Sequence, residues 1–415
     1  MKRHIALAAA ASLLASAHSA RAAGLSVDTQ SAQATGMATA VTGMVDDSSA
    51  IYYNPAGIAR GRSIDAQAGV SLIMPTITFT DLNNQSTTTP FSVVPPVFAY
   101  VSGGITDHLS AGVGLFTPYG LTIGWPAGWE GRSVITSAKL ATYYINPTVA
   151  YQLGPLRIGV GLQAVYGTVD LQRDLALPGG TFGSTELGGD AWGLGANVGL
   201  QLEAVPQVLS FGAHYRSAVA LPFDDGAAHF TGIPSSLAGT LHDQAAATRF
   251  VLPDSFAFGA AIRPTKKLVL DLDVVYYGWN HLQSVNITFP NDASGTLSSS
   301  SSLPKNWSAA VNVHLGGEYT INDAWRVRAG VMLDPSPSPG DTLTPDLPDM
   351  WRINFAVGGG YRHKSGLRFD LGYEFLALMS RTSTAPELSG TYSGFANIVT
   401  LGVGFGYPAK TAPPP

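Results

Sequence analysis

Apolar residues in this chain alternate with polar or small residues over stretches of about ten positions, the length of a strand that crosses a membrane. Between Leu367 and Phe375 every second residue is apolar, and the residues between them are Arg368, Asp370, Gly372 and Glu374. The same alternation occurs in 267–277, 325–332, 351–358 and 398–407. A period of two indicates strands that present one apolar face and one polar face.

About fourteen segments of this kind can be counted, an even number that is typical of single-chain bacterial barrels. Their approximate bounds are 63–75, 91–103, 109–121, 140–153, 156–170, 188–202, 207–219, 249–263, 267–279, 307–319, 325–333, 350–362, 367–380 and 395–407. Short turns alternate with long connections, as at 154–155 and 121–139. We therefore predict an all-β fold, a transmembrane antiparallel β-barrel of about fourteen strands over residues 63–407.

Composition supports this interpretation and excludes several other classes. The chain has 415 residues, of which 45% are hydrophobic and 12% charged, with no cysteine and a net charge of −5. Soluble domains carry about 25% charged residues, and a soluble β-sandwich would place charges on its outer face. A disordered tail, a disulfide scaffold and a nucleic-acid-binding protein are excluded by hydropathy, cysteine count and charge respectively. Tryptophans at segment ends, such as Trp279, Trp307, Trp325 and Trp351, fit the aromatic girdles of a barrel.

The two ends of the chain differ from the strand region. Lys2 and Arg3 precede an apolar run, and Ala20-Arg21-Ala22 forms a small-x-small cleavage site, so residues 1–22 are predicted to be a signal peptide. Residues 23–62 show no strand period and form either a periplasmic tail or a plug in the lumen. Residues 408–415 form a proline-rich tail.

Motifs of catalysis or metal binding are not found in the sequence. The histidines are scattered, without HExxH spacing and without a nearby GxSxG motif, and the glycine-rich stretches do not precede helices. We expect no enzymatic activity and no cofactor. A general diffusion porin and a structural or adhesin barrel stay open as alternatives.

The N-terminal region resembles the signature of the FadL/TodX outer membrane transporters of long-chain fatty acids and aromatic hydrocarbons. The resemblance rests on Gly36-Met37-Ala38 and on the stretch from Asp46 to Ala59, with further similar blocks at 114–121, 129–132, 146–151 and 252–255. It implies a monomeric fourteen-stranded barrel in the outer membrane of a Gram-negative bacterium. It also implies that residues 23–62 fold inside the barrel as a hatch, with Asn54, Pro55, Ala56 and Gly57 at its core.

The resemblance further implies a route for a hydrophobic ligand, from an external loop to a pocket at the hatch and then sideways into the bilayer. The side opening would lie at a kinked third strand, 109–121. Gly112, Gly114 and Pro118 are candidates for the kink, because glycine weakens a strand and proline removes a ladder donor. The alternative is that these glycines only fit the curvature of the barrel.

The lipid bilayer and its lipopolysaccharide are expected to surround the barrel. An external loop offers candidate residues that could capture a hydrophobic molecule there. Leu121, Ile123, Trp125 and Trp129 lie on a segment that we expect to be exposed, and exposed apolar patches mark interaction sites. The alternative is that the loop packs on itself. The last strand ends at Tyr407, the expected signal for the barrel assembly machinery.

Three arginines are candidate lumenal partners for the carboxylate of a fatty acid, namely Arg326, Arg328 and Arg352. Acidic residues such as Asp271, Asp273, Asp370 and Glu374 are predicted to point into the same lumen, so mutual salt bridges are the alternative. The sequence leaves the choice between fatty acids, alkanes and aromatic hydrocarbons open.

Overall fold

A computed structural model describes residues 24–290, 292 and 302–407 of the chain. The predicted signal peptide, 1–22, and the proline-rich tail, 408–415, lie outside the described residues. Within the described ranges, no helix has the length and apolar character needed to cross a membrane.

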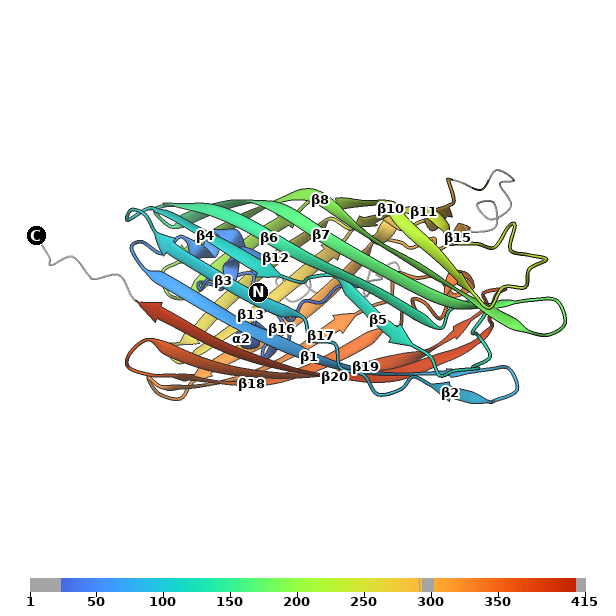
Figure 1. Ribbon diagram of the computed structural model, residues 1–415. Helices are drawn as coiled ribbons and strands as arrows, with labels where there is room; N and C mark the ends of the chain where they lie inside the picture. Colours follow the sequence, from blue (N-terminus) through green and yellow to red (C-terminus); the bar gives the residue numbers. More distant parts are fainter. Residues whose placement is uncertain (1–23, 291, 293–301, 408–415) are drawn as a thin grey trace, which may run out of the picture.

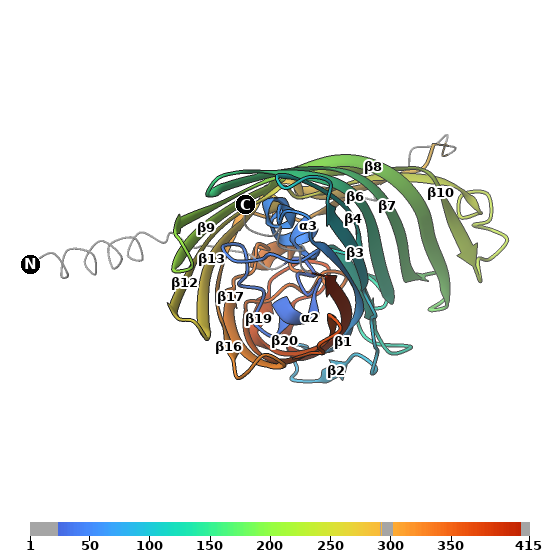
Figure 2. The same cartoon turned by 90° about the vertical axis from the view of Figure 1, so that its left-hand side faces the viewer.

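The strands form one antiparallel sheet that closes on itself (Figures 1 and 2). The first strand, β1 (Ile64–Thr80), pairs with the last, β20 (Gly390–Tyr407), from Ile64 opposite Tyr407 to Thr80 opposite Thr391. The predicted barrel of fourteen wall strands is confirmed.

Several wall strands are assigned in two parts, so that twenty strand segments are described. They continue as β2 (Ser86–Thr88), β3 (Val97–Gly104), β4 (Leu109–Phe116), β5 (Gly120–Gly124), β6 (Ser137–Leu153), β7 (Leu156–Ala176), β8 (Phe182–Val205), β9 (Leu209–Arg216), β10 (Val219–Thr231), β11 (Gln244–Leu252), β12 (Ser255–Thr265), β13 (Leu268–Tyr277), β14 (Ser284–Thr288), β15 (Ser302–Pro304), β16 (Ala310–Thr320), β17 (Trp325–Asp334), β18 (Arg352–Arg362) and β19 (Leu367–Ser383). The third wall strand is thus β4 followed by β5, interrupted at residues 117–119.

The two faces of the wall follow the alternation in the sequence. On β13, Leu270, Leu272 and Val274 are exposed on the outer surface, whereas Asp271 and Asp273 between them are buried. Phe369 and Leu371 of β19 are likewise each 50% exposed. A single register therefore puts apolar side chains toward lipid and polar ones toward the lumen.

Two of the tryptophans assigned to the girdle do not lie there. Trp325 and Trp351 are exposed on the outer surface, but Trp279 and Trp307 are buried and pack edge to face, with ring centroids 5.2 Å apart. Trp279 stands in the short helix η2 (Trp279–His281), beyond the end of β13, where the chain turns inward. The girdle prediction was wrong for these two residues because both lie outside the wall strands, where alternation no longer determines which way a side chain points.

The long connections are more ordered than predicted. The segments 219–248 and 283–305 connect predicted strands, and the structure places β10 and part of β11 in the first and the short strands β14 and β15 in the second. Ala228, Ala246, Ile287 and Phe289 form a small apolar core in this extension. β8 alone has 24 residues, compared with the about 9–11 that cross a bilayer. Another long connection, 335–350, contains the short helix η3 (Gly340–Thr342) and is largely buried.

Residues 24–62, here named the plug segment, lie inside the ring of strands, as the blue ribbon of Figure 2 shows. The segment contains three single turns of helix, α2 (Ala32–Thr35), α3 (Ala50–Tyr53) and η1 (Pro55–Ile58). Met37, Ile51 and Ala56 have no exposed surface. The plug segment and the lumenal wall therefore form a packed core.

Candidate functional site

The residues Asn54-Pro55-Ala56-Gly57, within the plug segment, form one of its contacts with the wall. The Asn54 side-chain amide donates to the carbonyl of Thr42 (3.1 Å) and to that of Leu200 in β8 (2.9 Å). Its oxygen accepts a hydrogen bond from the Ala56 amide at 3.3 Å, which caps η1. One side chain thus ties two parts of the plug segment to a wall strand.

Glycines on the lumenal face of the wall make room for this contact. Gly159 and Gly199 stand opposite each other on β7 and β8. A Cβ atom on Gly159 would lie 2.3 Å from the carbonyl carbon of Pro55, and one on Gly199 would lie 2.1 Å from Oδ1 of Asn54. Neither position tolerates a side chain while the plug segment stays in place.

Two further glycine pairs repeat this arrangement around the barrel. Gly316 and Gly330, opposite each other on β16 and β17, both meet the backbone of Met37. Gly358 and Gly372, opposite each other on β18 and β19, both meet Gly36. The backbone of the plug segment therefore lies directly against the backbone of the wall at three places.

Buried carboxylates of the wall bind backbone amides of the plug segment. Oδ2 of Asp273 accepts from the amides of Val41 and Thr42, both at 2.9 Å. Oδ2 of Asp271 accepts from the Gly43 amide at 3.1 Å. These acidic residues thus hold the plug segment rather than neutralise lumenal arginines.

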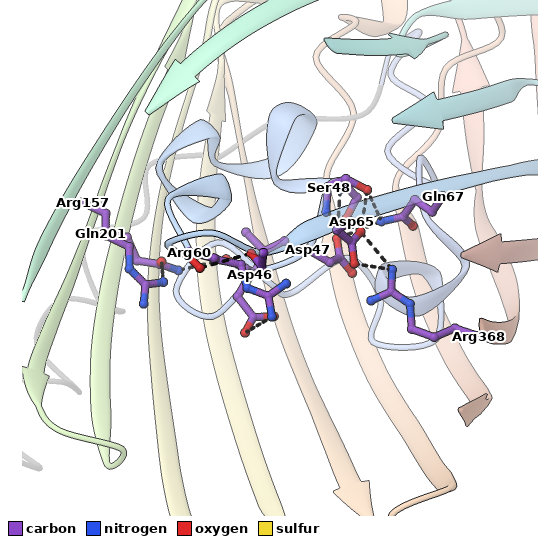
Figure 3. Close-up of polar contacts among 12 residues, drawn as sticks. Asp46, Asp47, Ser48, Arg60, Asp65, Gln67, Arg157, Gln201 and Arg368 are labelled. Carbon is purple, nitrogen blue, oxygen red and sulfur yellow. Dashed lines mark hydrogen bonds and ion pairs between the residues drawn. The ribbon is translucent and has the colours of Figure 1, made fainter. Parts of the chain in front are cut away.

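A polar network at the start of β1 connects three parts of the chain (Figure 3). Arg368 of β19 contacts Oδ1 of Asp65 at 2.9 Å and Oδ2 at 2.8 Å. Oδ1 of Asp65 also accepts from the amide (3.0 Å) and the hydroxyl (2.7 Å) of Ser48 in the plug segment. Gln67 donates to Asp47 at 2.9 Å, so the plug segment is fixed to β1 and β19 together.

A cavity of about 500 Å³ lies between the plug segment, the wall and the buried connection 335–350. Most of its lining is apolar, and includes Ile73, Ile77, Leu121, Ile123, Leu376 and Ile398. Residues of the interrupted third strand and of the segment before β3 also line it. The cavity therefore reaches a stretch of the wall where pairing is incomplete.

The ladder of hydrogen bonds is interrupted beside this cavity. On the side of β1 the contacts go on past Val97, with backbone hydrogen bonds between Ile73 and Val94 and from Ser71 to Pro96. On the other side β3 pairs with β4 only as far as Ala99 opposite Leu115, and Val97 has no partner in β4. Beyond these points β5 pairs with β6, and no pairing of β5 with residues 89–97 is found in the described part of the chain. Pro90, Pro95 and Pro96 lack the amide protons that such pairing needs. We name this interruption, between residues 89–97 and 117–124, the wall gap.

The candidate kink residues have different positions relative to this gap. Gly112 and Gly114 sit in a regular ladder between β3 and β6, and a Cβ atom on either would lie 2.9–3.0 Å from the Ile51 side chain. Both glycines thus accommodate the plug segment, and a kink at these two positions stays a prediction. Pro118 lies at the break itself, where its carbonyl accepts from the Val27 amide at 2.8 Å.

The expected capture residues divide into two groups. Leu121 and Ile123 line the cavity. Trp125 and Trp129 are only 6% and 4% exposed, and their rings stack with centroids 4.2 Å apart. Their indole N–H groups donate to the carbonyls of Pro345 and Ile135. The expectation of an exposed patch was therefore wrong for both tryptophans, because the loop packs against connection 335–350.

The three candidate arginines are all engaged in ion pairs. Arg326 contacts Glu318 at 3.2 Å, and Arg328 lies 2.7 Å from both Glu318 and Asp370. Neither of these two lines the cavity, whereas Arg352 does and contacts Asp334 at 2.6 Å. Salt bridges, the alternative considered for these residues, are what the structure shows, and they join nearby strands on the lumenal face of the wall. Of the acidic residues named from the sequence, Asp370 is among these partners.

Several polar residues of this region were missed by sequence reasoning. Asp28, Asp334 and Asp349 line the cavity, and burial raises the pKa of the Asp349 carboxyl, which lies in connection 335–350. The Asp349 carboxylate accepts from the Gly24 amide at 2.9 Å. For Asp334, the only signal in the sequence was its position at the end of a predicted strand. No local sequence pattern indicates that the following connection, 335–350, folds inward. No group of three or more metal-ligating side chains is assembled within the described ranges.

Comparisons with known proteins agree with this architecture. The family model described as "Outer membrane protein transport protein (OMPP1/FadL/TodX)" matches residues 13–407. The chain is 24% identical over 365 residues to the long-chain fatty acid transport protein of Salmonella typhi, covering 80% of this chain and 82% of that protein. It is 25% identical over 397 residues to a 47 kDa outer membrane protein of Pasteurella multocida, covering 87% and 89%.

Solved structures show the same fold. A FadL homologue of Pseudomonas aeruginosa superposes with a TM-score of 0.81 at 17% identity, covering 92% of this chain and 99% of that one. The toluene transporter TodX of P. putida superposes with a TM-score of 0.72 at 16% identity, covering 94% and 99%. The family match spans nearly the whole described chain, and with the barrel, the plug segment and the cavity it leads to one conclusion. The chain belongs to the OMPP1/FadL/TodX family of outer membrane transport proteins, and it is a transporter of hydrophobic molecules in the outer membrane of a Gram-negative bacterium, not an enzyme.

Proposed function

We propose that this protein takes up long-chain fatty acids or aromatic hydrocarbons and releases them sideways into the outer membrane. The observation that carries the proposal is the apolar cavity of about 500 Å³ whose lining includes both sides of the wall gap. Exposed apolar surface inside a barrel is stabilised when a hydrophobic ligand covers it. A ligand in this cavity has a path to lipid that avoids the polar groups at the rim.

The plug segment supports lateral release over passage straight through the barrel. Its residues are almost entirely buried, and its backbone meets the wall at the glycine pairs described above. A general diffusion porin needs an open aqueous pore, which this packing fills. The hatch at 23–62, with its motif at Asn54, Pro55, Ala56 and Gly57, therefore acts in our proposal as a barrier to water and ions.

Capture begins, in this proposal, at the residues that close the outer side of the cavity. Leu121 and Ile123 receive the apolar ligand, and the stacked pair Trp125 and Trp129 holds connection 335–350 above them. The first and last wall strands close the ring within one chain, so we further propose a monomer, processed after Ala22 and inserted by the barrel assembly machinery.

Uptake measurements test the lateral route. In a bacterial strain that lacks its own transporter, uptake of labelled oleate and toluene is compared between the wild type and Gly124→Trp. Gly124 lines the cavity at the wall gap, and a Cβ atom at this position would have no other atom within 4 Å, so the indole has room to obstruct the path without disturbing the fold.

The matched control is Gly239→Trp, on an external loop where a Cβ atom also meets nothing within 4 Å. We expect Gly124→Trp to lower uptake of the transported ligand by at least about tenfold, the equivalent of 1.4 kcal/mol, with the control unchanged. Unchanged uptake in both variants would contradict release through the wall gap. A Trp125→Ala, Trp129→Ala double variant with wild-type uptake would exclude the capture role of that loop.

A further inference from the structure

Part of the cavity lining is polar, and its charges bear on which hydrophobic molecules fit. The inference that follows rests on the proposed function, since it concerns the ligand of the same cavity. Four carboxyl groups line the cavity, those of Asp28, Asp334, Asp349 and Glu374. Arg352 is the one basic side chain among the described lining residues.

The Arg352 guanidinium is already engaged. Its Nε and Nη2 atoms lie 2.9 Å and 2.6 Å from Oδ2 of Asp334, so two of its donors converge on one carboxylate oxygen. Breaking a buried ion pair by taking away one partner is strongly unfavourable. Two of the five guanidinium N–H groups thus point at Asp334, and a ligand carboxylate would bind the remaining ones beside four carboxyl groups of the lining.

The same region contains hydrogen-bond acceptors that have no donor. Oδ1 of Asp334, Oδ1 of Asn354 and Oε2 of Glu374 are buried and have no hydrogen-bond partner in the structure. All three residues line the cavity and are at most 2% exposed. The Asn354 amide nitrogen donates to Oε1 of Glu374 at 2.6 Å, which orients its oxygen as an open acceptor. A buried acceptor without a donor is costly, so a ligand that supplies a donor gains from filling it.

We propose that this cavity selects hydrophobic molecules whose head group donates a hydrogen bond, such as a long-chain alcohol or an alkylphenol, over molecules that end in a carboxylate. The hydroxyl hydrogen of such a ligand pairs with one of the three open acceptors, and its tail covers the apolar lining. A carboxylate brings only acceptors to the same place, so it leaves the three open acceptors of the lining without a donor. A plain hydrocarbon fits the apolar part but leaves the acceptors unpaired.

Binding of three probes with the same tail tests this selectivity. The purified full chain in lipid nanodiscs is equilibrated at pH 7.5 with radiolabelled 1-dodecanol, dodecanoate or dodecane, and binding to empty nanodiscs is subtracted. We expect dodecanol to bind at least about tenfold more tightly than dodecanoate. Dodecane should bind with intermediate affinity. Equal or tighter binding of dodecanoate would overturn the inference.

A substitution in the polar region provides a second measurement. Glu374→Gln keeps the size of the side chain and replaces an acceptor with an N–H donor, so the preference for dodecanol over dodecanoate should become smaller. Glu203→Gln, an exposed position near the end of β8 and outside the cavity, is the matched control and should keep the wild-type ratio. A wild-type ratio in Glu374→Gln would also overturn the inference. Absence of specific binding by all three probes would instead contradict the proposed function, so the two failures are distinguishable.

Discussion

Glycine shapes the lumen of this barrel at the scale of single residues. Gly159 and Gly199 each stand where a methyl group would overlap Asn54 or Pro55, and the pairs on β16 to β19 do the same for other parts of the plug segment. Periodicity in the sequence places these glycines on the lumenal face. It gives no information about what they touch, because the contact lies between segments far apart in the chain.

Adding one methyl group at such a position should loosen the plug segment. For Gly199→Ala, whose Cβ would lie 2.1 Å from Oδ1 of Asn54, we expect a loss of about 1–3 kcal/mol in the free energy of unfolding, as for other overpacked cores. Urea unfolding in detergent measures this loss, and hydrogen exchange of residues 24–62 should become faster.

The control carries the same methyl group on another wall strand. A Cβ atom on Gly359 of β18 would have one neighbour, the Arg326 carbonyl oxygen at 3.9 Å, so Gly359→Ala should keep wild-type stability and exchange. If both variants behave alike, close packing of the plug segment against Gly199 is not what stabilises it.

Arginines and tryptophans show the limit of sequence reasoning at this scale. The inward orientation of Arg328 and Arg352 follows from alternation, but their partners, Glu318 and Asp334, depend on the register between strands. Trp125 is apolar and lies on an external loop, and Trp129 and connection 335–350 together bury it. Local sequence specifies which face a residue occupies, and distant segments determine whether it is exposed.

At the scale of elements, connection 335–350 forms one side of this cavity, which residues 347–350 line. It folds inward and is held by Lys305, which is 1% exposed and lies 2.7 Å from both Asp346 and Thr344 Oγ1. Burial alone would raise the pKa of the Asp346 carboxyl, but the Lys305 ammonium and the hydrogen bonds at this site hold that pKa below its usual range. The ion pair therefore stabilises the docked connection whenever Asp346 is ionised.

This lowered pKa predicts a pH dependence with a definite sign. A carboxyl whose pKa is lower in the folded state stabilises the fold above its unfolded pKa of about 3.9, and that contribution is lost as pH falls further. We expect connection 335–350 to resist limited proteolysis from pH 7 down to about pH 4 and to become cleavable only below.

Removing the carboxylate should release the connection at neutral pH. Asp346→Asn leaves the Lys305 ammonium buried without its partner, which we expect to cost about 3–5 kcal/mol. Asp323→Asn, in an exposed turn, is the control and should retain the wild-type cleavage pattern. Protection of Asp346→Asn at pH 7 equal to that of the wild type would show that the ion pair does not hold the connection.

At the scale of the whole molecule, the barrel and its plug segment behave as one packed unit. Alternation and turn spacing were sufficient to predict fourteen wall strands, because lipid and lumen impose a period of two along the wall. The wall gap was not predictable in this way. It arises where β3 starts late, after Pro95 and Pro96, and where β5 begins only after Pro118.

Electrical conductance reports on the packing of this unit. We expect wild-type protein in planar bilayers to show no large steady conductance, and deletion of residues 24–62 to produce it. Arg368→Met removes the contacts to Asp65 and should give brief openings, because the Asp65 carboxylate that holds Ser48 loses its charged partner on β19. Arg157→Met is the control, because it removes one contact between two wall strands, that of Arg157 with Gln201 at 3.1 Å. The barrel of this variant should stay closed. Steady wild-type conductance equal to that of the deletion would mean that the plug segment does not seal the barrel.

The seam between β1 and β20 has a consequence for biogenesis. It joins residues 64–80 to residues 391–407, so the ring closes only when the C-terminal strand is in place. Several wall strands between β4 and β20 contact the plug segment, which precedes β1 in the chain. Threading a chain segment into a finished ring is unfavourable. We therefore expect the plug segment to lie among the incomplete strands before β20 pairs with β1, so that the final pairing step encloses it.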